Sequence, residues 1–312
     1  MLHVLAVLAA AVLFGTTGTT QALGPDSTTP LSIGVVRMVV GGTGLALVAF
    51  VLAARHARRR PVDAGSARPK AGIGPLALMV LTGACLAVYQ PLFFFGTSHN
   101  GVAVGTVVAL GSAPVLAGLL EWTLTRRMPS AIWIGATALA TVGVVLLGFG
   151  GGSGGAGGTE PLGLIGSIGA GASFAVIANA QRRLLDAGWD PFTVVGAMGF
   201  SSAALCALAL PFVRLEWLGT PSGMAMALWL GIATIAIAYT LFTWGLSGLT
   251  AATAATLTLG EPLTASVLGL AVLGERLSIL AMVGLVVLAA GLVVLAWGSR
   301  ARRDPAPFAI EA

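Results

Sequence analysis

Long apolar segments alternate with short polar ones along the whole chain. About ten stretches of roughly twenty residues are almost free of charge, and most Lys, Arg, Asp and Glu residues lie between them. A bilayer core about 30 Å thick calls for about 20 apolar residues per helix. The pattern therefore predicts these membrane spans: Leu2–Leu23, Leu31–Ala54, Pro75–Thr97, Gly101–Leu124, Ala131–Phe149, Leu162–Asn179, Phe192–Val213, Met224–Leu246, Ala251–Leu273 and Ile279–Trp297.

The spans indicate helices, because strands of a membrane barrel are shorter and alternate apolar with polar residues. The first span could be mistaken for a signal peptide, but only His3 precedes its apolar run, so we interpret it as the first membrane helix. We predict an all-α polytopic membrane protein. Its two cysteines, Cys85 and Cys206, both fall inside spans and are interpreted as packing residues.

Composition supports a membrane protein. Hydrophobic residues make up 57% and charged residues 9% of the 312 residues, and the mean hydropathy is +0.97. So few charges could not cover the surface of a soluble domain of this size. The basic residues are scattered over short loops, which argues against a nucleic-acid-binding surface.

The distribution of basic residues predicts the orientation. Lys and Arg concentrate in cytoplasmic loops. With ten spans and a cytoplasmic N-terminus, one side receives only Arg214 and Arg276. The cytoplasmic side receives Arg55, Arg58, Arg59, Arg60, Arg68, Lys70, Arg126, Arg127, Arg182, Arg183, Arg300, Arg302 and Arg303. We therefore expect a multi-pass protein of the cell membrane with both termini in the cytoplasm.

The two halves of the chain resemble each other. Ser112-Ala113-Pro114 aligns with Gly260-Glu261-Pro262, and in this register Gly143 meets Gly291; after a one-residue shift, Gly96 meets Gly245. The glycine-rich residues 151–160 lie between the halves. They lack a following Gly-Lys-Ser/Thr, so we interpret them as a flexible linker and not as a phosphate loop.

We predict two five-helix repeats, 1–150 and 161–300, and a cytoplasmic tail, 301–312. An odd number of spans per repeat makes the second repeat enter the membrane in the opposite sense. Inverted repeats are common in secondary transporters, where one site near the midplane opens alternately to each side.

With these repeats, Phe14-Gly15-Thr16-Thr17-Gly18, Arg37, Gly260-Glu261-Pro262 and Gly274-Glu275-Arg276-Leu277-Ser278, the chain resembles an EamA-type transporter of the drug/metabolite transporter superfamily. The resemblance covers almost the whole chain. It implies ten helices, a central cavity, and export or exchange of small metabolites. The chain departs from a symmetric pair of glutamates, because Arg127 stands where Glu275 stands in the second half, and Glu121 comes earlier.

Polar residues within the spans are the candidate functional residues, because they are costly in hydrocarbon. Glu261 lies about ten residues, hence about 15 Å, into its span. It could bind a cation, take up a proton that drives transport, or hydrogen-bond a neighbouring helix. Arg37 lies about seven residues, roughly 10 Å, into its span. It could pair with Glu261, bind a substrate carboxylate or extend toward the outer interface. The family resemblance implies a structural or gating role for it.

Aromatic and amide residues at corresponding positions are the other candidates. Tyr89 and Gln90 lie in the third span, and Tyr239, Thr240 and Trp244 in the eighth. They could line one cavity from two sides or serve as packing and interfacial residues. Asn179 fits a helix–helix hydrogen bond or a gate.

We predict a secondary transporter of small organic metabolites, such as amino acids, related metabolites or drugs, working by alternating access as an exporter. Neither catalytic motifs nor an ATP site were found, so we expect no enzyme activity and no cofactor or metal. Protons are the candidate coupling ion. A lipid-modifying enzyme and a non-transporting scaffold remain alternatives, and a dimer through Gly101-x-x-x-Gly105 remains open.

Overall fold

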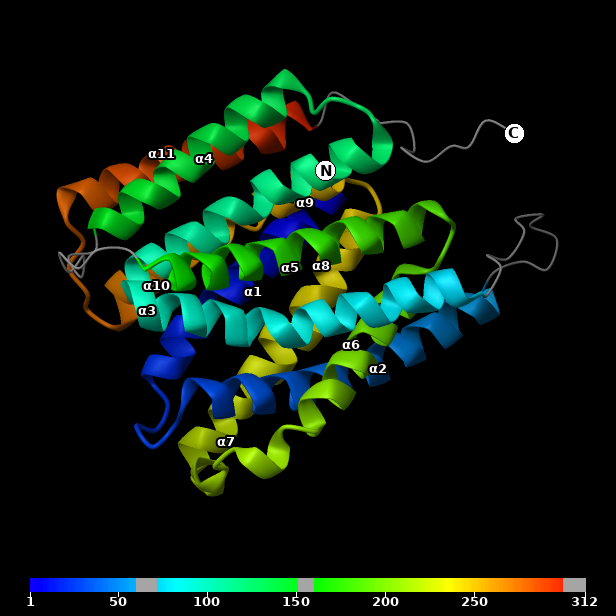
Figure 1. Ribbon diagram of the computed structural model, residues 1–312, viewed down its shortest axis with the longest axis horizontal. Coiled ribbons are helices and arrows are strands. Elements are labelled where there is room, and N and C mark those ends of the chain that lie inside the picture. The colour runs from blue at the N-terminus through cyan, green and yellow to red at the C-terminus, as the bar shows by residue number, and fades with distance from the viewer. Residues whose placement is uncertain (60–71, 151–159, 300–312) are drawn as a thin grey trace.

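The protein is a bundle of helices, and α3, α4, α5 and α11 among them run roughly along the horizontal axis of Figure 1. The computed structural model describes residues 1–59, 72–150 and 160–299. In these ranges 9 helical stretches are long and apolar enough to cross a membrane, and Pro191–Ala207 forms a shorter apolar helix. The chain is therefore an all-α polytopic membrane protein of about ten helices, which confirms the prediction.

The first half of the chain contains α1 (Leu2–Ala22), α2 (Pro30–Arg59), α3 (Ile73–Thr125) and α4 (Ala131–Gly150). The second half contains α5 (Pro161–Asp186), α6 (Pro191–Ala207), η1 (Leu210–Phe212), η2 (Glu216–Gly219), α7 (Pro221–Leu228), η3 (Trp229–Ile237), α8 (Ala238–Leu246), α9 (Ala251–Leu257), α10 (Gly260–Val272) and α11 (Ile279–Gly298).

The helix starts follow directly from the sequence. Proline opens α2, α5, α6 and α7, where its missing N–H and fixed φ suit the first helical position. Side-chain oxygens of Asp190, Thr220, Thr250 and Ser278 accept backbone N–H bonds at the starts of α6, α7, α9 and α11. Short loops therefore suffice to turn the chain between spans.

Three spans have an irregular backbone. α3 contains two spans, which meet at Gly101. Its φ of 78° and ψ of 157° form a conformation that glycine adopts readily and residues with a Cβ rarely adopt. The eighth span consists of α7, the π-helix η3 and α8. The ninth is interrupted at Thr258 and Leu259, between α9 and α10.

The seventh span is shorter than predicted. We expected it to extend to Val213, but α6 ends at Ala207 and the 3-10 turn η1 follows. Pro211 lies inside that turn and has no N–H to continue an α-helix. An apolar run was therefore not enough to place this helix end.

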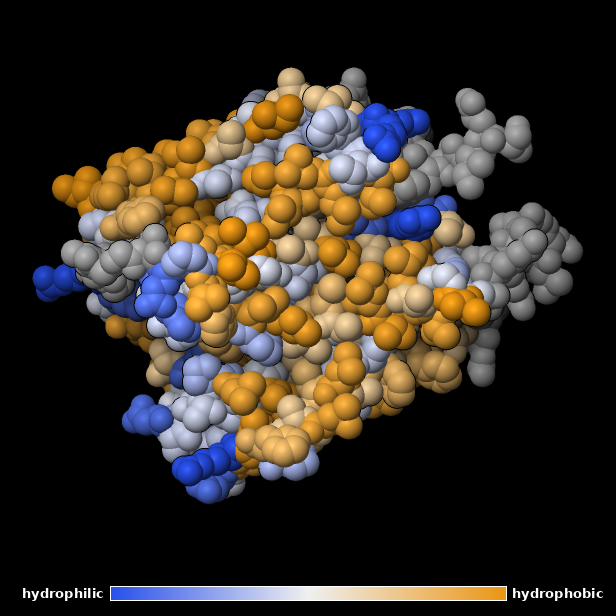
Figure 2. Space-filling view, viewed as in Figure 1, coloured by the Kyte–Doolittle hydropathy of each residue, from blue (hydrophilic) through white to orange (hydrophobic). Residues whose placement is uncertain are grey.

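The exterior of the bundle is apolar between two polar ends. Figure 2 shows hydrophobic residues across the middle and hydrophilic ones gathered near the left and right ends. Large side chains such as Phe50, Phe200 and Val286 are exposed. So much exposed apolar surface matches a lipid environment rather than water.

α4 and α11 lie side by side at the top of Figure 1 and pack through glycine. Gly143 lies against Leu288, and Gly291 lies against the backbone of Ala140. In the register that aligns Gly143 with Gly291, Ala140 aligns with Leu288. The contact is therefore reciprocal: each helix uses the same two positions.

A second contact also occurs twice. Gly96 of α3 lies against Ser167 of α5, and Gly245 of α8 lies against Val7 of α1. Gly96 and Gly245 are corresponding positions of the two halves. α3 thus packs on the start of α5 as α8 packs on the start of α1.

The two ends of the bundle differ in charge. α2, α3 and α5 all end on the right in Figure 1, which brings together Arg55, Arg126, Arg127, Arg182 and Arg183; we call this the basic end. α1, α4 and α10 end on the opposite side, which we call the far end. Residues Arg60, Arg68, Lys70, Arg300, Arg302 and Arg303, the linker 151–159 and the tail 301–312 lie outside the described residues.

Candidate functional site

A cavity of about 700 Å³ lies among the helices of both halves. α1, α2 and α3 supply most of the lining from the first half, and η3, α8 and the α9–α10 region supply it from the second. Cavities that bind small molecules commonly have volumes of about 300–1,000 Å³. The space is therefore sufficient for a small metabolite.

The cavity has a mouth at the far end and a buried floor. Gln21, Pro30 and Ser98 line it near the far end, and Pro30 and Ser98 are exposed. Leu86 and Phe174 line it deeper in the bundle and are buried. A solute can thus enter from the far end, whereas packed side chains close the path toward the basic end.

Arg37 contributes the positive charge of the cavity. It lies on α2, and its side chain is only 7% exposed. Its Nε has no hydrogen-bond partner among the described residues. A buried donor without a partner is costly, so this guanidinium has free hydrogen-bonding capacity for an anionic group.

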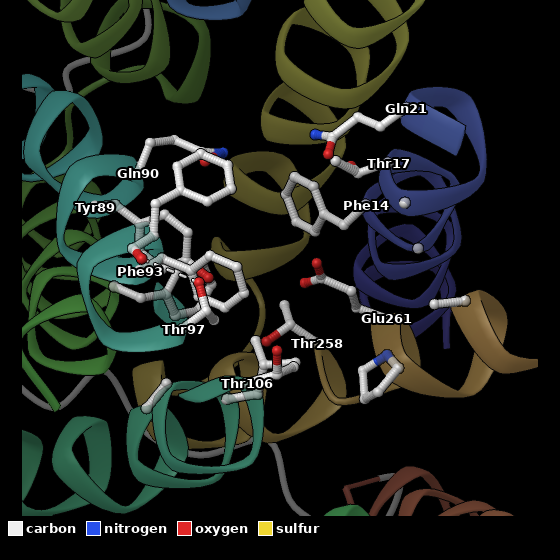
Figure 3. A pocket seen from close by; sticks show the side chains of 18 of the residues that line it. Phe14, Thr17, Gln21, Tyr89, Gln90, Phe93, Thr97, Thr106, Thr258 and Glu261 are labelled. Carbon is white, nitrogen blue, oxygen red and sulfur yellow. Dashed lines mark hydrogen bonds between the residues drawn. The ribbon is translucent and has the colours of Figure 1, made fainter. Parts of the chain in front are cut away.

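Glu261 contributes the negative charge. It lies in the first turn of α10, immediately after the break at Thr258, and its own N–H bonds the Thr258 carbonyl over 2.9 Å. The N-terminus of a half-helix near the midplane favours a negative group. In Figure 3 the carboxylate points into the open space between α1 and α3.

Arg37 and Glu261 are the charged residues among those that line the cavity, and they do not form an ion pair in the part of the chain described. Of the interpretations of Arg37, direct pairing with Glu261 and extension to the interface do not match this geometry. Two opposite charges stay separately accessible to one solute.

Aromatic and amide side chains form a large part of the remaining wall. Tyr89 and Gln90 line the cavity from α3, and Tyr239 lines it from α8, as do Phe14 and Phe93 from α1 and α3. Figure 3 shows the α3 group facing Phe14 across the cavity. Phe14 and Tyr239 meet edge to face with ring centroids 5.1 Å apart. Gln90 is 7% exposed, and its Oε1 is buried without a partner among the described residues.

Three candidates lie outside the cavity lining. Thr240 donates to the Ala236 carbonyl over 2.7 Å, within its own helix. Trp244 stacks on His3 with ring centroids 4.8 Å apart. Asn179 donates to the carbonyls of Ala117 and Ala175 and holds α5 against α3. The structure therefore brings together Arg37, Tyr89, Gln90, Tyr239 and Glu261, but not these three.

Several lining residues escaped the sequence argument. Phe14, Thr17, Gln21, Phe93 and Thr258 all face the cavity in Figure 3. Uncharged residues in an apolar span are hard to distinguish from packing residues. Thr17 carried a usable signal, because it lies in the Phe14–Gly18 segment that supported the family resemblance.

We find no group of three or more His, Cys, Asp or Glu side chains that could hold a metal ion within the described ranges. Cys85 and Cys206 are free thiols. The site therefore offers charges, amides, hydroxyls and aromatic faces as its means of recognition.

Comparison with known proteins identifies a consistent family. The model of the EamA-like transporter family matches residues 1–149 and again 161–297. The chain is 37% identical over 303 residues to a Bacillus subtilis (strain 168) protein described as "Uncharacterized transporter YwfM", covering 97% of this chain and 96% of that protein. A crystal structure whose description names no function aligns with TM-score 0.73 and 20% identity, covering 94% of this chain and 98% of that chain, which supports the fold.

Proposed function

Because the chain belongs to the EamA-like transporter family, we propose that its cavity is the solute site of a secondary transporter for small organic metabolites. The observation that carries this proposal is the cavity of about 700 Å³ with Arg37 and Glu261 on its walls. A scaffold does not require such a site, and a lipid-modifying enzyme would need reacting groups clustered near the interface.

The lining favours a zwitterionic solute. Arg37 suits a carboxylate, because a guanidinium donates paired hydrogen bonds to it. Glu261 suits an ammonium group, and Phe14, Phe93 and Tyr89 offer faces for an apolar or cationic part. Amino acids and related metabolites combine these features. A cationic drug would use only Glu261 and the aromatic faces.

We propose alternating access between two inverted repeats, 1–150 and 161–300. The reciprocal contact of Gly143 and Gly291 and the repeated contact of Gly96 and Gly245 support it, because a two-fold axis relating the halves produces such pairs. The family model's two separate matches agree with the same division. A site between inverted repeats can open to each side in turn.

In this proposal the basic end faces the cytoplasm. Both termini then lie in the cytoplasm, and the cavity mouth opens to the extracellular side of the membrane. The support is the concentration of arginine at that end. We propose export as the direction, with Glu261 taking up a proton from outside once the solute has left. Proton entry is then the return step of an exchange.

Transport by purified protein in vesicles tests this function. Radiolabelled amino acids and a cationic dye are loaded as separate solutes, and a pH gradient of either sign is applied. We expect gradient-driven movement of at least one zwitterionic solute. Glu261→Gln keeps the shape but not the charge, so pH-gradient-driven transport should fall by about 100-fold, the effect of losing a buried charge contact.

Glu216→Gln is the matched control, because Glu216 is exposed and lies outside the cavity lining. Its transport rate should equal that of the unchanged protein. Proton dependence that survives in Glu261→Gln would remove the coupling role. Absence of transport for every solute would instead argue against the proposed function itself.

A further inference from the structure

Arg182 ties two parts of the basic end together. It lies on α5, and its Nη1 donates to the carbonyl oxygens of Leu246, Ser247 and Leu249 at 2.8, 3.2 and 2.8 Å. These carbonyls end α8 and form the turn into α9. A cationic donor on three carbonyls at a helix end is a strong, charge-assisted contact.

Asp186 fixes the direction of this arginine. Its Oδ1 lies 2.6 Å from Nη2 and its Oδ2 lies 3.1 Å from Nε, so the carboxylate binds one edge of the guanidinium while the carbonyls bind the other. The Arg182 side chain is 12% exposed and that of Asp186 is 4% exposed. The contact is therefore largely sheltered from water, which strengthens it relative to a surface ion pair.

A second residue holds the same turn from the other side. Glu121, at the end of α3, accepts the N–H of Ala252 over 2.7 Å. Ala252 lies in the first turn of α9, just after the carbonyls that Arg182 binds. The α8–α9 turn is thus held by α5 and by α3 together.

Buried polar groups lie between this turn and the cavity floor. Gln181 is fully buried, accepts from Thr243 Oγ1 over 2.9 Å, and precedes Arg182 on α5. Asn179 bonds the Ala117 carbonyl on the same stretch of α5. Polar side chains are costly in a membrane interior unless they serve packing or a path for solute.

The backbone marks out a movable unit around the turn. The segment Ala238–Leu257 contains α8, the turn and α9, and irregular backbone lies at both of its limits: the π-helix η3 before it and the Thr258–Leu259 break after it. Such irregular points are common hinges within helices. Arg182 and Glu121 bind this segment at the α8–α9 turn, midway between the two irregular points. Bonds at this position restrain movement about both of them.

We propose that Arg182 and Glu121 form the gate of the basic end, and that the α8–α9 hairpin swings away from α5 to admit solute past Thr243 and Gln181. The proposal rests on the transport function proposed above. It adds the residues that hold one state closed and the segment that moves. When the Arg182 and Glu121 contacts break and the basic end opens, the cavity mouth at the far end would close.

Thiol accessibility tests the gate without requiring a known solute. In a Cys85→Ala/Cys206→Ala background, Thr243→Cys reports on the buried path and Thr97→Cys on the cavity. The protein is held in nanodiscs and treated with a membrane-impermeant maleimide. Arg182→Gln should raise the labelling rate of the Thr243→Cys reporter by about tenfold or more, and lower that of Thr97→Cys, because it removes several charge-assisted bonds.

Arg183→Gln is the matched control, since Arg183 is the exposed neighbour of Arg182. It should leave both rates unchanged. Should Arg182→Gln not fold, Arg182→Lys keeps the charge but not the fork of donors, and should raise Thr243→Cys labelling to a smaller extent. Monodisperse elution and retained helical circular dichroism establish which variant is folded.

Equal labelling in the folded Arg182 variant and the Arg183 control would overturn the gate. If transport by the unchanged protein is measured while labelling stays equal, the gate fails and the transport function stands. If labelling rises as expected and no solute moves, the gate stands and the solute proposal fails.

Discussion

The far end and the basic end treat their buried polar groups in opposite ways. Around the cavity, Arg37 Nε, Gln90 Oε1 and Thr17 Oγ1 have no protein partner among the described residues. At the basic end, Arg182 and Gln181 are hydrogen-bonded to neighbouring helices. The difference teaches that polarity alone does not mark a binding site in this bundle. Unpaired polarity beside a cavity is the more useful indicator, because a solute or water that enters the cavity can supply the missing bonds.

The largest expected effect on this contrast comes from removing the positive charge of Arg37. Arg37→Gln should weaken binding of a carboxylate-bearing solute by about 100-fold, since a charged contact in a sheltered site is lost. Thermal unfolding should change little, because no protein partner loses a bond. Equilibrium binding to purified protein measures the effect. Arg214→Gln, at an exposed arginine, should bind normally, and equal affinities for the two variants would contradict the assignment.

A packing change separates the two ends by stability. A Cβ at Gly245 would lie 2.6 Å from Val7 Cγ2 and 2.7 Å from the His3 carbonyl, so Gly245→Val should lower the free energy of unfolding by about 1–3 kcal/mol. A Cβ at Gly18, beside the cavity, meets nothing within 4 Å. Gly18→Val should keep its melting temperature but slow transport. Equal losses of stability would show that the far end is packed as tightly as the basic end.

The smallest effects come from two matched hydroxyls. Thr256 Oγ1 contacts Trp133 Nε1 at 3.0 Å and Thr137 Oγ1 at 2.9 Å, so Thr256→Val should cost about 1 kcal/mol or more by leaving those groups unpaired. Thr17→Val removes a hydroxyl that already lacks a partner, and should leave stability nearly unchanged. Thermal melts of both variants in one detergent measure the difference, which would vanish if the Thr17 hydroxyl were bonded.

Much of the fold could be predicted from the sequence, because a lipid bilayer imposes one requirement on every span. A span needs about twenty apolar residues with internally paired backbone groups, and the ten predicted segments reflect that demand. The end of α6 at Ala207 did not follow, since Pro211 and the 3-10 turn stop the helix inside an apolar run. The interruptions in the eighth and ninth spans were also invisible to hydropathy, because bent and straight helices have the same composition.

Cavity-lining residues were predicted best where a charge or a rare polar group lies deep in a span. Glu261, Arg37 and Gln90 are such residues, and all three line the cavity. Thr240 and Trp244 do not, and the π-helix before them gives a physical reason. A π-helix holds more residues per turn than an α-helix, so it changes which side of the following helix faces the cavity. The correspondence between the third and eighth spans, on which those two candidates rested, does not reveal such a change.

The reciprocal pair α4 and α11 has a practical consequence for measuring motion. Its glycine contacts bring two backbones close together, and of its residues Leu147 is the one found on the cavity wall within the described chain. Two spin labels placed on the lipid-facing sides of these helices would provide a fixed ruler. Displacements of the α8–α9 hairpin could then be measured relative to α4 and α11, independent of how the molecule tumbles or tilts in its disc.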